Sequence, residues 1–178
     1  MPTPAVLAEV LYKLGICGER LDGPFEHRYL IGERFLQHLS FMGCAPALEF
    51  EPQQAGQPDW ASFTFVLLTP LFEEARFLVD QQMARPRCPH CRKRTSLTSE
   101  QAKSCQQTLE CEHCGKAASV AQWDWREYGA CSRLFFSIVN VYPKESIPTD
   151  SFMQQLASAT HCSWHYFYIH DVLPDVTN

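Results

Sequence analysis

Two pairs of cysteines carry most of the chemistry that this sequence could perform. Each pair encloses two residues, in Cys88-Pro-His-Cys91 and in Cys111-Glu-His-Cys114. A C-x2-C turn brings two sulfur atoms to one side of a tight loop, and two such turns joined by a hairpin supply four thiolates. Four thiolates in tetrahedral arrangement are typical ligands of structural zinc. The spacing therefore predicts one zinc ion, Zn²⁺, bound by Cys88, Cys91, Cys111 and Cys114.

The completeness of this ligand set decides what the metal can do. Four thiolates leave no coordination position for water, so we expect a structural rather than a catalytic zinc ion. An iron or labile redox site is the alternative for the same ligands. His90 and His113 lie inside the two turns and are expected to point outward, because the cysteine set is complete without them. Cys105, between the pairs, is expected to be a free thiol outside the set.

The segment from Arg85 to Lys116 resembles the zinc-ribbon module, which occurs in many otherwise unrelated proteins. The resemblance rests on the two C-x2-C turns and on the length of chain between them. It implies a metal-ligand role for the four cysteines and for no other residue. The rest of the chain shows no family resemblance, so the module by itself does not indicate a pathway or an activity.

Basic residues are concentrated around the first cysteine pair, at Arg85, Arg87, Arg92, Lys93 and Arg94. Cations beside a ribbon can bind phosphate, which would make Arg87, Arg92, Lys93 and Arg94 an interaction surface for nucleic acid. The same cations can instead offset the charge of about −2 on a four-thiolate zinc centre. The sequence leaves both roles open.

Composition and charge exclude several classes of protein. The chain has 178 residues and a formal net charge of −5, which argues against a protein built as a whole to coat nucleic acid. No apolar run approaches about 18 residues, so no membrane-spanning helix is expected. The N-terminus lacks the basic region and cleavage site of a signal peptide. Nine cysteines, of which four have zinc spacing, leave an odd remainder that fits a disulfide framework poorly. These features predict a cytoplasmic protein in a reducing compartment.

Helix and strand patterns occur on both sides of the cysteine-rich segment. They indicate one α+β domain formed by residues 1–84 and 117–178, with a mixed sheet, flanking helices and an inserted zinc-ribbon hairpin at 85–116. The predicted helices cover 4–14, 33–42, 71–79 and a segment that opens at 148–150, and the last part of the third, Phe77-Leu78-Val79, could instead be extended. The predicted strands cover 27–31, 47–51, 63–68, 119–125, 134–142 and 164–169.

Catalytic motifs are lacking in this sequence. It has no Gly-rich phosphate loop, no G-x-S-x-G elbow and no H-E-x-x-H helix. Cys44 could serve a thiol enzyme or redox carrier, although a buried structural cysteine is the simpler interpretation of its position. The sequence therefore favours a non-enzymatic, zinc-binding accessory, adaptor or assembly protein that binds a protein partner. Nucleic-acid binding through the basic turn is the first alternative, and a thiol-dependent activity of Cys44 is the second.

Overall fold

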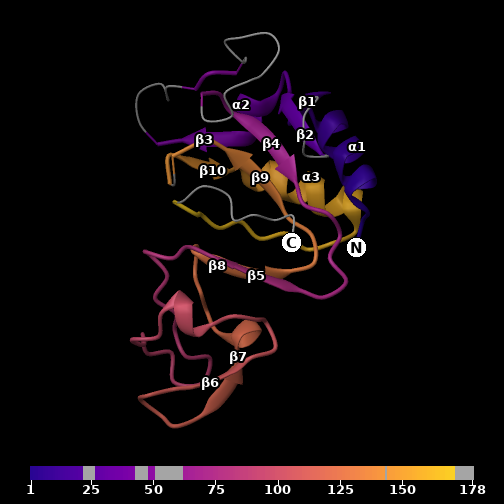
Figure 1. The fold of residues 1–178 in the computed structure, drawn as a ribbon. Helices are drawn as coiled ribbons and strands as arrows, with labels where there is room; N and C mark the ends of the chain where they lie inside the picture. The colour runs from indigo at the N-terminus through magenta and orange to yellow at the C-terminus, as the bar shows by residue number, and fades with distance from the viewer. Residues whose placement is uncertain (22–26, 43–47, 51–61, 143, 171–178) are drawn as a thin grey trace. The chain divides into compact units, whose positions relative to one another are not determined.

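The chain divides into two units in this computed structural model (Figure 1). Unit 1 consists of Met1–Leu71 and Leu134–His165, and unit 2 consists of Phe72–Arg133 and Tyr166–Asn178. The structure describes residues 1–21, 27–42, 48–50, 62–142 and 144–170. The predicted ribbon segment, 85–116, lies wholly within unit 2.

Helix α1 (Pro4–Leu14) begins and ends where local signals place it. Oγ1 of Thr3 accepts a hydrogen bond from the Val6 amide at 3.3 Å, and Pro4 fills the first helical position, where no amide hydrogen is needed. Gly15 ends the helix in the left-handed conformation, with φ of 76°. The predicted helix at 4–14 is confirmed.

Unit 1 contains a four-stranded antiparallel sheet in the order β1–β2–β4–β9. Its strands are β1 (Cys17–Arg20), β2 (Arg28–Ile31), β4 (Phe65–Leu68) and β9 (Phe136–Val139). A second pair consists of β3 (Leu39–Phe41) and β10 (Ser146–Pro148). The α+β class is confirmed. All pairings between described strands are antiparallel rather than mixed, because strand direction follows the path of the connections and not the apolar pattern.

The core of unit 1 lies between this sheet and two helices. Helix α3 (Asp150–Thr160) is capped by Thr149, whose Oγ1 accepts from the Phe152 amide, and it confirms the helix predicted to open at 148–150. The buried core includes Leu7, Leu11, Val66, Leu68, Phe152 and Leu156. Burying each such side chain contributes about 1.5–3 kcal/mol. Unit 1 therefore has a hydrophobic core that contains none of the four paired cysteines.

Unit 2 is built from two short antiparallel ladders and a core of its own. Strand β5 (Arg76–Val79) pairs with β8 (Gly129–Ser132), and β6 (Thr108–Glu110) pairs with β7 (Ala117–Ser119). Two 3-10 turns, η1 (Ser99–Gln101) and η2 (Val120–Gln122), complete the elements. The buried core contains Ala84, Cys88, Leu109, Cys111, Val120, Trp123 and Trp125. Two of the paired cysteines are thus part of this core.

Two predicted helices are wrong over most of their length. Within the segment 71–79, residues 76–79 form strand β5, because they pair with β8, and residues 71–75 form neither helix nor strand. Of the helix expected at 33–42, only α2 (Phe35–His38) is helical. The following residues form β3, whose partner is β10. In both cases pairing with a distant strand prevails over local helical spacing.

Three predicted strands are also absent or displaced. Residues 120–122 form η2, so β7 ends where the strand at 119–125 was expected to begin. Residues 164–169 join no strand. Of the strand expected at 47–51, residues 48–50 form none and the other two lie outside the described residues. The strands expected at 27–31, 63–68 and 134–142 are confirmed as β2, β4 and β9. In the described part of the chain, no helix is long and apolar enough to cross a membrane.

Candidate metal centre

The four paired cysteines converge in unit 2 although up to 26 residues separate them. Their Sγ atoms all lie within 4.8 Å of one another. The closest contacts cross between the pairs: Cys88 to Cys114 and Cys91 to Cys111, each 3.8 Å between sulfur atoms. A tetrahedral ion with metal–sulfur bonds of about 2.3 Å would hold its sulfurs about 3.8 Å apart. The donor set therefore fits a metal ion that prefers thiolates.

The two turns that carry the cysteines have the same backbone structure. We call residues 88–94 knuckle 1 and residues 111–117 knuckle 2. In each knuckle the amide four residues after the first cysteine donates to the carbonyl of that cysteine, at 2.9 Å and 2.8 Å. The amide of the first cysteine donates to the carbonyl five residues further on, at 3.0 Å in both. These local bonds give the two turns that carry the sulfur atoms the same hydrogen-bond pattern.

The two histidines fasten the knuckles to each other. His90 in knuckle 1 bonds through Nε2 to the Ala117 carbonyl at 3.3 Å, and His113 in knuckle 2 bonds to the Arg94 carbonyl at 2.8 Å. A carbonyl only accepts, so Nε2 is the donor in both. Neither histidine belongs to the sulfur cluster, as expected, but each reaches across to the other knuckle. The sequence signal is a short repeat, Cys-x-His-Cys-x-Lys, which occurs in both knuckles.

The sulfur atoms cannot all become thiolates easily without a cation. Burial opposes ionisation of Cys88, but the amides of Cys91 and His90 and two neighbouring sulfurs outweigh it and lower its pKa to about 6. The Lys116 amide lowers the pKa of Cys114, but burial and the other sulfurs outweigh it and raise this pKa to about 11. Ionisation of one cysteine therefore raises the pKa of its neighbour. A divalent cation would remove this conflict and displace the remaining protons.

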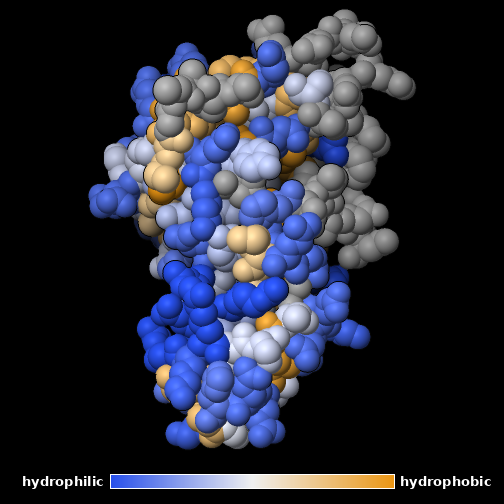
Figure 2. Space-filling model, turned by 90° about the vertical axis from the view of Figure 1, so that its left-hand side faces the viewer, coloured by the Kyte–Doolittle hydropathy of each residue, from blue (hydrophilic) through white to orange (hydrophobic). Residues whose placement is uncertain are grey.

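The basic residues around knuckle 1 are not equivalent in the structure. Arg92, Lys93 and Arg94 are exposed, whereas Arg87 is half-buried. The Arg87 backbone exchanges hydrogen bonds with Asp124, and its Nε is buried with no hydrogen-bond partner. Figure 2 shows the deepest blue of the hydropathy scale gathered in one zone over unit 2. Three of the four residues predicted as an interaction surface are thus accessible, and the surface itself stays a prediction.

Equivalent positions of the two knuckles give a first testable prediction. Arg92 and Gly115 both adopt left-handed backbone, with φ of 62° and 66°. We expect Gly115→Ala to lower the free energy of unfolding by about 1–2 kcal/mol, since the left-handed conformation crowds a Cβ. The nearest atom to such a Cβ is Glu110 Oε1 at 4.0 Å, so the cost is in the backbone alone.

Arg92→Gly serves as the matched variant, because it removes a Cβ from the same backbone position of the other knuckle. We expect it to leave unit 2 at least as stable as the native unit. Urea unfolding of the metal-bound protein, followed by tryptophan fluorescence, measures both. A destabilised Arg92→Gly together with an unchanged Gly115→Ala would contradict the assigned backbone.

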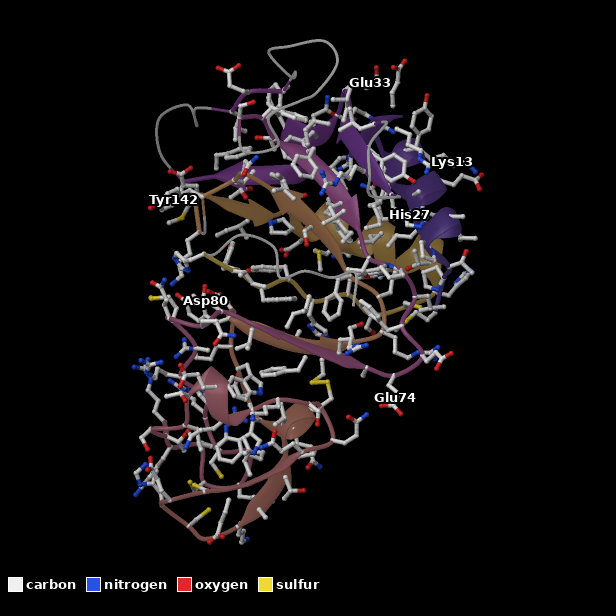
Figure 3. All side chains as sticks on the ribbon, viewed as in Figure 1. Lys13, His27, Glu33, Glu74, Asp80 and Tyr142 are labelled. Carbon is white, nitrogen blue, oxygen red and sulfur yellow. A yellow bond between two sulfur atoms is a disulfide. The ribbon has the colours of Figure 1, made fainter. Side chains whose placement is uncertain are left out.

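A buried carboxylate in unit 2 was not anticipated from the sequence (Figure 3). Asp80 follows β5 and is 0% exposed. Its Oδ1 accepts from the amides of Gln82 and Met83 at 2.9 and 2.6 Å, and its Oδ2 accepts from the His170 amide at 2.7 Å. The Nδ1 atom of His170 also lies 2.7 Å from Oδ2. Burial alone would raise the pKa of Asp80, but these donors outweigh it and lower the pKa.

Asp80 joins the segment 166–170 to the body of unit 2. A second bond, from the Tyr168 amide to the Glu127 carbonyl at 2.8 Å, holds the same segment. The local signal for part of this arrangement is an aspartate that directly follows an apolar strand, where its side chain can accept from amides two and three residues on. The His170 contact has no local signal. We interpret Asp80 as a structural clamp.

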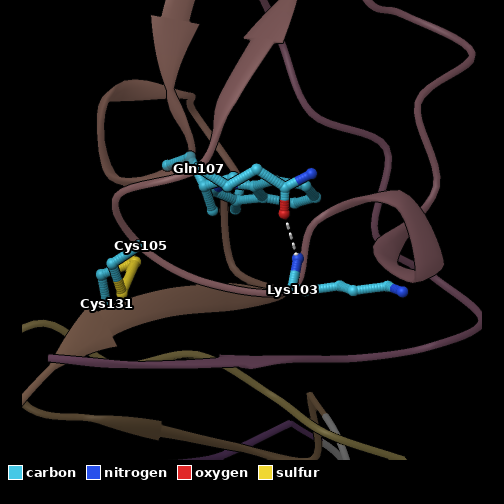
Figure 4. The surroundings of a disulfide bond; sticks show 6 residues. Lys103, Cys105, Gln107 and Cys131 are labelled. Atoms are coloured by element: carbon cyan, nitrogen blue, oxygen red, sulfur yellow. Dashed lines mark hydrogen bonds between the residues drawn. A yellow bond between two sulfur atoms is a disulfide. The ribbon is translucent and has the colours of Figure 1, made fainter.

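Cys105 is bonded to Cys131 in a disulfide (Figure 4). The expectation of a free thiol at Cys105 is wrong, although Cys105 does lie outside the sulfur cluster. The bond connects the chain before β6 to strand β8, and its Cα atoms are 5.8 Å apart. Beside it, Oε1 of Gln107 accepts from the Lys103 amide at 2.7 Å. An odd remainder of five cysteines still allows one disulfide, and no local pattern marks Cys131, 26 residues away, as the partner.

We expect the double variant Cys105→Ser/Cys131→Ser to lower the free energy of unfolding of unit 2 by about 3 kcal/mol, because a bond between these positions closes a long loop in the unfolded chain. The variant should still bind one metal ion, since its sulfur cluster is intact. Urea unfolding and elemental analysis measure the two effects. Cys162→Ser, in unit 1, is the control, with an expected change within about 0.5 kcal/mol. Loss of metal from the double variant would contradict the separation of the two cysteine sets.

Cys44, the candidate nucleophile, lies outside the described residues. Among those that are described, the paired cysteines are the one group of three or more potential ligand side chains close enough to share a metal ion. Comparison with known protein families, curated proteins and solved structures finds no match to this chain. The cluster is consistent with a metal-binding module, and membership of the zinc-ribbon class stays a proposal.

Proposed function

We propose that unit 2 is a zinc-stabilised binding module and that the protein acts as an accessory, adaptor or assembly factor. The observation that carries this proposal is the four-sulfur cluster of Cys88, Cys91, Cys111 and Cys114. A metal ion held by four cysteines has no position left for water or substrate, so its role is structural. The protein would then act through the surface that the metal holds in shape.

The placement of the sulfurs supports a structural role for the metal. Cys88 and Cys111 are buried, and they pack in the same core as Trp123 and Trp125. Both strands of the β6–β7 ladder also belong to this core through Leu109 and Ala118. A metal ion at the cluster would therefore connect both knuckles to the core of unit 2. Small units of this size commonly need a metal or a disulfide to remain folded.

The four-sulfur donor set by itself fits zinc or iron. We propose zinc because two paired C-x2-C turns are typical of structural zinc sites. We expect protein purified without chelator to contain one zinc ion per chain and to be colourless. Elemental analysis with a visible absorption spectrum measures both. A red, iron-containing protein, or one that contains no metal after purification from zinc-replete cells, would contradict the proposal.

Nucleic-acid binding is the second candidate function, and one observation favours it. Arg92, Lys93 and Arg94 are exposed and take part in none of the ion pairs between described residues.

The proposal of a zinc-stabilised module includes a cytoplasmic location, where thiolates stay available to metal.

A further inference from the structure

The two knuckles of unit 2 differ in only a few respects, and the differences are informative. They share their cysteines, their histidines and a lysine, Lys93 or Lys116, at the same position. Their backbone hydrogen bonds match, and each histidine bonds to the other knuckle. Around that lysine, knuckle 1 has Arg92 and Arg94 where knuckle 2 has glycine and alanine. Knuckle 1 therefore adds two guanidinium groups to a frame that knuckle 2 forms without them.

Arg92 occupies a backbone position that favours glycine. Its φ of 62° is uncommon for a residue with a Cβ, and knuckle 2 meets the same requirement with Gly115. The side chain of Arg92 makes no compensating ion pair among the described residues. The sulfur atoms are supplied with hydrogen bonds by backbone amides, such as that of His90 at 3.3 Å from Cys88 Sγ. Both knuckles need left-handed backbone at this position, and glycine adopts it at lower cost, so an arginine here is consistent with a function of its side chain.

No carboxylate among the described residues pairs with the cations of knuckle 1. The sequence from 85 to 99 contains five Lys and Arg residues and no Asp or Glu. The ion pairs of the described residues involve Glu9, Glu112 and Asp80 as the acids, and none reaches Arg92, Lys93 or Arg94. Glu112, the acid of knuckle 2, accepts instead from the amide and hydroxyl of Ser96. Three consecutive exposed cations are thus available to an external anion.

We infer that knuckle 1 binds the phosphate backbone of nucleic acid through Arg92, Lys93 and Arg94. This inference rests on the proposed function, because it needs the metal-bound fold of unit 2. Guanidinium groups bind phosphate oxygens with paired hydrogen bonds, and a lysine adds a compact charge between them. Neutralised phosphates release counterions, which supplies the driving force for binding.

The surroundings of knuckle 1 favour nucleic-acid phosphate over a protein partner. Protein interfaces are centred on exposed aromatic or large apolar side chains. Between 85 and 119, no large apolar side chain of the described residues is exposed, and the nearest one in sequence is the single Met83, 47% exposed. Trp123 and Trp125 are buried, and their indole N–H groups donate to the carbonyls of Ala118 and Val120. These two indoles offer no stacking platform for bases. Contacts to phosphate alone carry no sequence information, so we expect binding without sequence preference.

The test uses the full-length, metal-bound protein and a fluorescein-labelled single-stranded RNA of about 20 nucleotides, with a DNA duplex of the same length. Fluorescence anisotropy gives the dissociation constant. Three phosphate contacts predict that affinity weakens about 20- to 40-fold between 50 and 200 mM salt. Arg92→Gln/Lys93→Gln/Arg94→Gln should lower the affinity at least about tenfold at 50 mM salt.

The matched control is Lys103→Gln/Lys116→Gln/Arg126→Gln. It removes the same charge from exposed residues of the same unit and includes the lysine of knuckle 2. We expect its affinity to stay within about threefold of the native value. Arg92→Gly alone should weaken binding while it leaves the stability of unit 2 undiminished, and this variant decides the result if the triple variant loses its metal. If Arg92 served only the fold, its replacement by glycine would not lower the affinity for RNA while the stability of unit 2 stayed unchanged.

Three results would overturn the inference: no salt-dependent binding by the native protein at 50 mM salt, an equal loss of affinity in the control triple variant, or competition by polyglutamate as strong as that by RNA. The last would indicate an acidic protein partner. These failures differ from failure of the proposed function. If the native protein holds no metal, the proposed function fails, and the inference fails with it because its premise is lost. If it holds one zinc ion and binds no RNA, only the further inference fails.

Discussion

Replacement of Cys111 by serine is expected to release the metal ion and to unfold the β6–β7 ladder of unit 2. A neutral hydroxyl does not replace a thiolate, and Cys111 is a buried member of the cluster, 3.8 Å from Cys91 between sulfur atoms. Structural zinc typically contributes about 10–16 kcal/mol of apparent binding free energy, which is folding free energy for a small unit. Unit 1 should stay folded, because its core contains none of the four ligands.

Hydrogen exchange followed by mass spectrometry separates these effects by residue, and elemental analysis measures the metal. Amides of β6 and β7 should lose protection in Cys111→Ser, whereas those of β4 and β9 should keep it. The Cys105–Cys131 bond, which persists in this variant, should confine residual order to the chain near β5 and β8. Cys162→Ser is the control. The prediction fails if Cys111→Ser retains its metal, or if β4 and β9 lose protection together with the ladder.

The second large effect is expected at Asp80. Asp80→Ala should lower the free energy of unfolding of unit 2 by about 2–4 kcal/mol, because it leaves the amides of Gln82, Met83 and His170 without their acceptor. The segment 166–170 should lose hydrogen-exchange protection at the His170 amide. Glu74→Ala is the matched control, since Glu74 is an exposed acid of the same unit, with an expected change within about 0.5 kcal/mol.

The same carboxylate predicts how unit 2 responds to acid. The pKa of Asp80 lies below its ordinary value of 3.8 in the folded unit. A lowered folded-state pKa contributes stability that is fully present above the unfolded value and is lost as the pH falls through the folded value. We therefore expect the stability of unit 2 to decrease below about pH 4, measured by urea unfolding at a series of pH values. Asp80→Asn should lack the part of the pH dependence that Asp80 contributes. A variant whose stability changes with pH just as that of the native protein does would contradict this prediction.

Local signals sufficed where an element is stabilised by its own neighbours in sequence. Helices α1 and α3 follow from Thr3 and Thr149, each of which accepts a hydrogen bond from an amide three residues on. The two cysteine turns are local in the same sense, because each knuckle closes its own hydrogen bonds within five residues. Two such turns left few arrangements other than a shared four-sulfur cluster. The sequence by itself therefore determined the capped helices and the candidate metal ligands.

Tertiary structure decided the elements whose partners are distant. Residues 76–79 are compatible with a helix or a strand, and pairing with β8 selects the strand. The sequence predicts a free thiol at Cys105, but in the folded chain strand β8 places Cys131 next to it and the two form a disulfide. Asp80 and His170 are 90 residues apart, so no local pattern connects them. In the sequence, five basic residues form one cluster. The exposure of their side chains depends on packing, which leaves Arg87 half-buried and Arg92, Lys93 and Arg94 exposed. The physical reason is that a short-range pattern encodes hydrogen bonds within a turn, whereas burial and strand pairing depend on which distant surface the chain meets.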